Sequence, residues 1–204
     1  MTTSGTYAFL TDHYASERLK TLTVWAGFAD DDLRFRCADR ARTPLEHMVH
    51  QCVSEDTWMR RMFGLESPHP VLPAEESRLG FMRHYAQVSA ERLDRLVERD
   101  DAWWAGETSF FGVPRSRAWV LVRRIAHTAH HRGQLTVLLR LRDRAVFSTY
   151  GPSADTGGLF ANEAPTIYRA PTVEALLDAV ARGDSGPPLP GPGSKPASER
   201  PDRA

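Results

Sequence analysis

One long helical segment constrains the fold of this chain more than any other feature of its sequence. Residues 115–142 contain no Pro, and their apolar residues recur at helical spacing, so we predict an uninterrupted helix there. Within it, His127 and His131 are four residues apart, which places both imidazoles on one helix face, one turn apart. Two imidazoles at this spacing can hold one divalent cation, so this helix is a candidate half of a metal site.

A second helix supplies further histidines. Thr43 and Pro44 are typical of an N-cap and a first helical position, and Gly64 is typical of a helix end, so we predict a helix over residues 43–64. His47 and His50 lie about 60° apart around this helix, and by geometry alone either can be a third ligand. Three neutral imidazoles leave a position on the metal open for water or substrate, which is typical of a catalytic site.

The same histidines also have a simpler interpretation. A pair at this spacing, taken alone, is more often an ordinary surface or core pair than a metal site. The two apolar helices, however, carry five histidines, and burying several imidazoles without a shared partner is costly, which favours a metal. His130 points about 100° away from its neighbours in the motif, so we expect a structural or supporting role for it.

Two further helices complete the predicted fold. The apolar pattern predicts helices over residues 6–28 and 75–99, with a crossover over residues 100–114 before the last long helix. We therefore predict an all-α, up-down four-helix bundle with a C-terminal extension. The crossover is rich in aromatic residues, and we expect them to cover the open side of the bundle, the alternative being that they wall a substrate pocket; they are Trp103, Trp104, Phe110 and Phe111.

The C-terminal part has a different character. We predict that the bundle domain with its extension covers residues 1–170 and that a short amphipathic helix follows within residues 171–182, with Thr172 as its N-cap. Residues 183–204 are rich in Pro and poor in large apolar side chains, so we predict a disordered tail.

Two motifs resemble the DinB superfamily, a group of metal-binding four-helix bundles that includes YfiT-like proteins and thiol-dependent transferases. The segment HTAHHRGQL, residues 127–135, is similar to the last-helix signature of that superfamily, in which three residues separate a His from the sequence His-Arg-Gly-Gln. The segment from His50 to Gly64, with Glu55 and Trp58, resembles its second-helix pattern. Residues 150–168 resemble the extension of one subgroup, and the whole resemblance covers roughly residues 6–170.

The resemblance implies a DinB/YfiT-like bundle whose metal ligands are His50, His127 and His131. His50 takes the ligand position because of its register with Trp58 and Gly64, while His47 remains able to replace or support it. Three His ligands suit zinc or nickel. In such relatives the activated group is thought to be a low-molecular-weight thiol, so the resemblance implies a metal-dependent enzyme that acts by thiol transfer or hydrolysis on a small electrophile. The alternative is a non-catalytic metal-binding or stress-associated bundle.

Three other residues of these helices have expected roles. Ser54 lies one helical turn after His50, where we expect it to contact metal-bound water, and Glu55 is expected to pair with an Arg of the last helix. Gly133 costs about 1 kcal/mol relative to Ala inside a helix. Such a Gly often marks a close backbone approach, either to the second helix or to another copy of the chain, and we expect a homodimer.

Composition excludes other classes of partner. Lys plus Arg and Asp plus Glu number 26 each, so the chain lacks the basic surface that nucleic-acid binding requires. The two cysteines, Cys37 and Cys52, imply no disulfide framework, and Cys52 is expected in the core. No signal segment or apolar run of about 20 residues is present. We therefore expect a cytoplasmic protein with a small-molecule substrate and no membrane partner.

Overall fold

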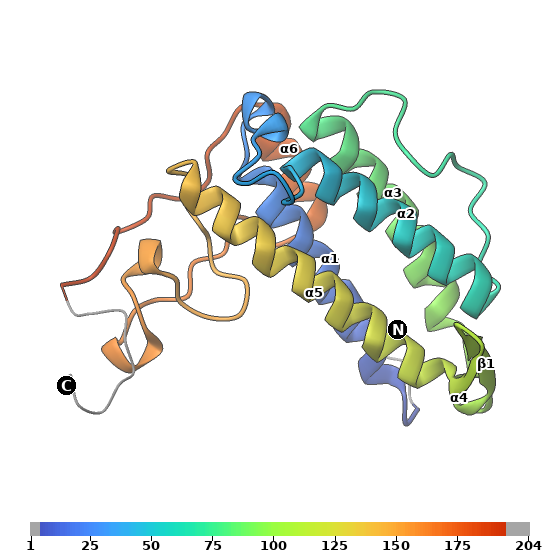
Figure 1. Cartoon of the computed structure of the whole chain (residues 1–204). Helices are drawn as coiled ribbons and strands as arrows, with labels where there is room; N and C mark the ends of the chain where they lie inside the picture. Colours follow the sequence, from blue (N-terminus) through green and yellow to red (C-terminus); the bar gives the residue numbers. More distant parts are fainter. Residues whose placement is uncertain (1–4, 195–204) are drawn as a thin grey trace.

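The computed structural model describes residues 5–194 of the chain. Its framework consists of four long helices that run side by side (Figure 1): α1 (Ala8–Ala26), α2 (Pro44–Phe63), α3 (Arg78–Val97) and α5 (Arg117–Leu141). Helix α1 packs against α3 and α5, and α2 packs against α5 and α3. The predicted helical bundle is confirmed, and its helix ends lie within a few residues of the expected ones.

Local sequence signals fix the start and end of α2. The Thr43 hydroxyl accepts a hydrogen bond from the Glu46 amide at 3.1 Å, and the Glu46 carboxylate accepts one from the Thr43 amide at 2.8 Å. This capping box satisfies two free donors of the first turn. Gly64 ends the helix with a φ of 67°, a left-handed conformation that favours glycine. These signals set the register of His47 and His50 on the helix.

The crossover between α3 and α5 is more ordered than a plain loop. It contains the short helix α4 (Asp101–Ala105) and an antiparallel hairpin of β1 (Glu107–Phe110) and β2 (Val113–Ser116). The hairpin turn places Phe111 and Gly112 at φ values of 50° and 87°, as expected for a two-residue turn that matches strand twist.

The aromatic residues of this crossover close one end of the bundle. Trp103 and Trp104 pack against Phe63 of α2, with ring centroids 6.0 and 6.5 Å away. Phe110 packs edge-on against Trp58, also of α2, at 5.2 Å. Trp103, Trp104 and Phe110 thus cover this end of the bundle, while Phe111 stays largely exposed.

The segment after α5 contains the single turns η2 (Ala154–Thr156) and η3 (Phe160–Asn162) and ends in α6 (Val173–Ala181). Helix α6 packs against α1 and α3, and its Leu176 and Val180 complete the apolar core. A further turn, η1 (Asp30–Arg34), joins α1 to α2.

The predicted tail is only partly described. Of its residues, 183–194 lie beside the extension, where the Gly191 amide donates to the Asp155 carbonyl and Arg169 donates to the Asp184 carbonyl. Residues 195–204 lie outside the described part of the chain.

The extension is tied to the bundle beside the histidine motif. The Tyr150 hydroxyl donates to the Glu17 carboxylate of α1 at 3.0 Å. Arg132 of α5 forms an ion pair with the same carboxylate at 2.6 Å and is almost fully buried. The Arg of the His-Arg-Gly-Gln motif is therefore held by a structural ion pair, with Tyr150 completing the contact.

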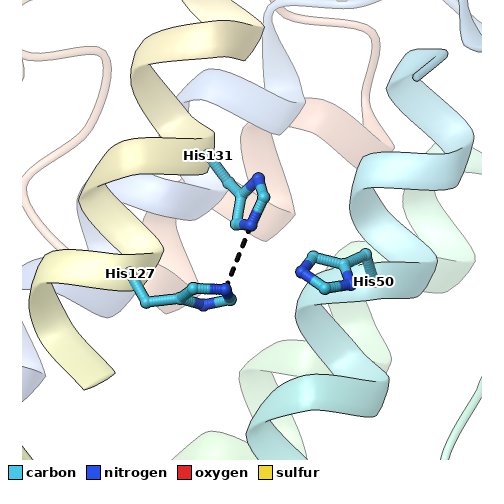
Figure 2. Close-up of side chains that lie close together, drawn as sticks. All are labelled: His50, His127 and His131. Atoms are coloured by element: carbon cyan, nitrogen blue, oxygen red, sulfur yellow. Dashed lines mark hydrogen bonds between the residues drawn. The ribbon is translucent and has the colours of Figure 1, made fainter. Parts of the chain in front are cut away.

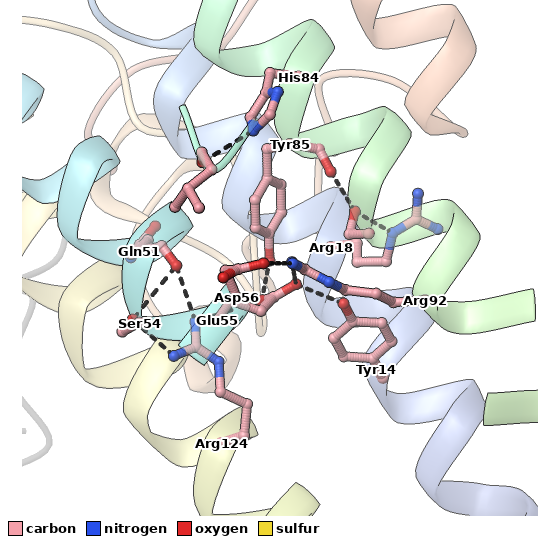
Figure 3. Close-up of polar contacts among 12 residues, drawn as sticks. Tyr14, Arg18, Gln51, Ser54, Glu55, Asp56, His84, Tyr85, Arg92 and Arg124 are labelled. Carbon is pink, nitrogen blue, oxygen red and sulfur yellow. Dashed lines mark hydrogen bonds and ion pairs between the residues drawn. The ribbon is translucent and has the colours of Figure 1, made fainter. Parts of the chain in front are cut away.

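One buried carboxylate joins all four long helices (Figure 3). Glu55 of α2 has no exposed surface and accepts hydrogen bonds from Tyr14 of α1 at 2.6 Å and Tyr85 of α3 at 3.0 Å. Arg92 of α3 and Arg124 of α5 each donate to it at 3.3 Å. The predicted pairing of Glu55 with an Arg of the last helix is confirmed.

The charge of Glu55 is maintained by these partners. Burial alone would raise the pKa of Glu55, but the guanidinium groups of Arg124 and Arg92 and the two tyrosine hydroxyls outweigh it and lower that pKa below its usual value. Burial, and then the Glu55 charge, raise the pKa values of Tyr14 and Tyr85 well above 10, so both remain hydrogen-bond donors.

Cys52 lies in the core, and Gly133 lies where α5 has no close neighbour within residues 5–194. Cys52 is buried in the core as predicted, and burial raises the pKa of its thiol to about 12. Among the described residues, no atom beyond the neighbouring backbone of α5 itself lies within 4 Å of the position that a Cβ would take at Gly133, so this glycine does not serve a close approach to α2. The expected homodimer remains a prediction.

Within residues 5–194, no helix is both long and apolar enough to cross a bilayer.

Candidate metal centre

Three histidines from two helices point toward one another (Figure 2): His50 of α2 and His127 and His131 of α5. Each offers a ring nitrogen, and the three nitrogens lie within 4.8 Å of one another. The Nε2 atoms of His127 and His131 are 3.2 Å apart. Two nitrogens bound to one tetrahedral zinc ion would be separated by about 3.3 Å, given Zn–N bonds of about 2.05 Å. The donor set therefore fits a divalent cation with little movement of these two rings.

The other histidines of the two helices lie at the edge of this group. The His47 ring is 5.4 Å from that of His131, but His47 is not among the three residues whose nitrogens converge. It is buried, and its Nδ1 has no hydrogen-bond partner within the described part of the chain. His130 is exposed, with its ring 5.0 Å from that of His131. The geometry favours His50 over His47 as the helix-α2 member of the group.

Their surroundings keep these imidazoles neutral. Burial, reinforced by the charges of Arg42 and His131, lowers the pKa of His50 to about 4. Burial and the Arg124 charge lower the pKa of His127 to about 3. Burial also lowers the pKa of His131, against the opposing effect of its hydrogen bond to Gln134. Because only a neutral imidazole carries a free lone pair, the group is ready to bind a metal at neutral pH.

Two residues of α5 contact the outer nitrogens of these rings. The Nδ1 of His131 lies 3.0 Å from the Gln134 side-chain oxygen, so it donates there and leaves Nε2 free as a ligand atom. The Nδ1 of His127 instead lies 3.3 Å from Nη1 of Arg124, which can only donate. In this arrangement the neutral His127 ring carries its proton on Nε2. A metal at that atom would move the proton to Nδ1, away from any acceptor seen here, so the His127 contact is less well arranged for a metal than that of His131.

Arg124 connects the histidine group to the buried Glu55. Its Nη1 also donates to Ser54 Oγ at 2.8 Å, and its Nη2 pairs with Glu55 at 3.3 Å. Ser54 in turn donates to the Gln51 carbonyl at 3.3 Å. The Ser54 hydroxyl, which we expected to face the metal, is thus engaged by Arg124, because that guanidinium reaches it across the α2–α5 interface.

Trp58 forms a wall behind His127. The two rings are stacked, with an interplanar angle of 26° and centroids 5.6 Å apart. Phe110 and Phe111 of the hairpin also pack edge-on against Trp58, with ring centroids 5.2 and 6.0 Å away. The crossover therefore fixes the orientation of a candidate ligand, although its aromatic residues do not line the cavity beside the histidines.

A cavity of about 480 Å³ opens onto the three histidines. Its other lining residues include Arg42, from the segment before α2, and Arg123 of α5. Neither arginine was predicted from the sequence as a site residue. Arg123 and the inward Arg124 occupy different faces of α5, which helical spacing from His127 would have indicated; the position of Arg42 depends on the fold of residues 35–43 and has no signal in the sequence.

Comparison with known proteins identifies the family. The model of the DinB family matches residues 1–158. The chain belongs to the DinB family. This agrees with the resemblance of the two histidine motifs, and it covers the four-helix bundle together with the first part of the extension.

Solved structures share this fold. A DinB-like protein from Bacillus cereus ATCC 10987 is 25% identical, with a TM-score of 0.63, over 74% of this chain and 100% of that chain. A DinB-like protein from Bacillus subtilis is 15% identical, with a TM-score of 0.56, over 69% of this chain and 96% of that one. A comparison with curated proteins gave no match.

Proposed function

We propose that this DinB-family protein binds one divalent metal ion through His50, His127 and His131 and uses it in catalysis on a small electrophile. The observation that supports the proposal best is the position of the three convergent histidines at the wall of a cavity of about 480 Å³. A metal that serves only stability is normally closed off by a fourth protein ligand. No fourth His, Cys, Asp or Glu joins the group among residues 5–194.

The reaction we propose is thiol transfer or hydrolysis, with zinc or nickel as the metal and a low-molecular-weight thiol as cosubstrate for transfer. A divalent cation in such a site lowers the pKa of a coordinated water or thiol and can polarise a carbonyl group. The chain contributes neutral imidazoles as ligands, Gln134 as the acceptor that orients His131, and a Trp58 ring that stacks on His127.

Elemental analysis followed by an activity screen tests this proposal. The purified protein should contain one zinc or nickel ion per chain. The loaded protein should then consume a small electrophile, such as an epoxide or an alkyl halide, faster with a low-molecular-weight thiol present than the same protein treated with a chelator. Bound metal without any thiol-transfer or hydrolysis activity would instead support the non-catalytic alternative.

Substitution of each α2 histidine in turn shows which one is a metal ligand and which one only supports the site. His50→Ala should abolish metal binding, because it removes one of the three convergent nitrogens. His47→Ala should weaken binding by no more than about 10–100-fold, the effect typical of a residue that only supports a ligand. Metal titration of the two variants side by side decides the point, and loss of the metal from the His47 variant alone would move the site toward the start of α2.

Acidification should release the metal only well below neutral pH. The pKa of His50 is lowered to about 4 and that of His127 to about 3, from the usual 6.5, so protons compete with the metal only near those values. Occupancy, measured by elemental analysis after dialysis, should be unchanged at a pH of about 5.5 and lost as the pH falls through about 4 to 3. Release that is already complete at a pH of about 6 would contradict the lowered pKa values.

The lowered pKa of His50 also affects the free energy of unfolding of the metal-free protein. Between the usual pKa of 6.5 and the folded-state value of about 4, the unfolded chain binds more protons at His50 than the folded chain does. The free energy of unfolding of the metal-free protein should therefore decrease as the pH falls through this range. Urea unfolding at several pH values measures it, and His50→Gln should remove its share of the slope.

A further inference from the structure

Two arginines stand at the cavity in front of the histidines. Arg42 approaches from the segment before α2, and Arg123 projects from α5. Arg42 also lines a neighbouring cavity of about 510 Å³, together with Arg40 and His47. The two cavities therefore meet at Arg42, beside the candidate metal ligands.

These arginines lack the partners that other arginines of the chain have. Arg92, Arg124 and Arg132 all form ion pairs with buried carboxylates. Among the described residues, no carboxylate lies within ion-pair distance of Arg40, Arg42 or Arg123, and no Asp or Glu lines either cavity. The cavity wall is cationic without an internal counter-charge.

The positive charge reaches the histidines. Arg42 lines the same cavity as His50, His127 and His131, and it lines the neighbouring cavity together with His47. Three neutral imidazoles leave the full charge of a divalent metal uncompensated, so the metal and the two arginines would raise the potential in the same small space. A cavity with such a potential concentrates anions.

We propose that the histidine cavity selects an anionic small molecule, whose carboxylate or phosphate group binds Arg42 and Arg123 while its other end reaches the histidine centre. The planar guanidinium group, with its fork of N–H donors, matches both kinds of anion. This inference rests on the proposed metal-dependent function and specifies the class of its substrate or cosubstrate. Arg42 and Arg123 are specificity-determining residues, distinct from the metal ligands.

Thiols of matched length test the charge preference. The protein is loaded with cobalt(II), whose visible absorption changes when a thiolate binds, and is titrated with mercaptopropionate, mercaptoethyl phosphate and the neutral mercaptopropanol. We expect at least one anionic thiol to bind about tenfold more tightly than the neutral one, the size of one charge-assisted hydrogen-bonded pair. The tighter of the two anionic thiols identifies carboxylate or phosphate as the natural group.

Single substitutions test whether Arg42 and Arg123 cause the preference for anionic thiols. Arg42→Gln and Arg123→Gln should each reduce it several-fold, while binding of mercaptopropanol stays nearly constant. Both side chains are exposed and lie on different elements, so neither substitution is expected to prevent folding. Arg61→Gln, an exposed arginine at the far end of α2, is the matched control and should leave the preference unchanged.

The outcomes separate this inference from the proposed function. Equal affinity of the wild-type protein for charged and neutral thiols, with cobalt bound, would overturn the anion preference and leave the metal site standing. An unchanged preference in both arginine variants would overturn their assignment. Failure of the wild-type protein to bind cobalt would overturn the proposed function itself.

Discussion

Proteins carrying His127→Ala or His131→Ala are expected to be purified almost free of metal, whereas the wild-type protein is expected to carry one ion per chain. The two Nε2 atoms are 3.2 Å apart, so each substitution removes one of a pair of nitrogens already spaced for a shared cation. With one α5 histidine gone, only two protein ligands remain. We expect the metal affinity to fall by more than about 100-fold, which exceeds the loss typical when a supporting residue is removed.

Elemental analysis and metal titration measure this effect, and circular dichroism shows whether the helices persist. The control is His13→Ala, an exposed histidine of α1 that is not one of the three convergent residues. It should keep the full complement of metal. Unchanged occupancy in a His127→Ala, His131→Ala double variant would show that the metal, if present, binds elsewhere on the chain.

The second large effect is expected in stability. Glu55→Ala should lower the free energy of unfolding by about 3–5 kcal/mol, the loss typical when one partner of a buried ion pair is removed. Glu55 accepts hydrogen bonds from all three other long helices, and Arg92 and Arg124 are almost fully buried beside it. Without Glu55, Arg124 has no other carboxylate partner among the described residues and Arg92 keeps only Asp56.

Urea unfolding monitored by circular dichroism measures this loss, with the metal removed so that binding does not contribute. Glu76→Ala is the matched control, because Glu76 is exposed before α3 and has no ion pair within the described part of the chain; its substitution should change stability by less than about 0.5 kcal/mol. A loss of less than about 1 kcal/mol for Glu55→Ala would mean that the two arginines find water or other acceptors when the carboxylate is absent.

The sequence allowed the helices and most of the histidine group to be predicted, for identifiable reasons. Thr43 and Glu46 determine where α2 begins, and Gly64 determines where it ends. The one-turn spacing of His127 and His131 follows from their separation of four residues on α5. Such features depend on local geometry alone. The choice between His47 and His50 was different, because it depends on how α2 is rotated against α5, and that rotation results from packing across the whole interface.

What the sequence did not indicate depends on contacts between distant segments. The hairpin after α4 replaces a plain crossover, and its Phe110 supports Trp58 behind His127. Arg42 lines the cavity from the segment before α2, where Arg36 contacts Glu46 of that helix. The engagement of Ser54 by Arg124 likewise requires the two helices to lie at their observed separation. None of these contacts has a periodic pattern from which it could be predicted.

Glu55 and its hydrogen-bond partners are buried, whereas Arg42 and Arg123 are exposed. This difference determines which residues of the bundle can be substituted without loss of the fold. Substitutions at Glu55 or its partners are expected to affect folding directly, so these buried residues can change little. Arg42 and Arg123 line the cavity, are exposed and form no ion pair among the described residues, so we expect that they can be exchanged at little cost to stability. One bundle with one histidine centre can therefore acquire new ligands through single changes at its rim, while its interior stays the same.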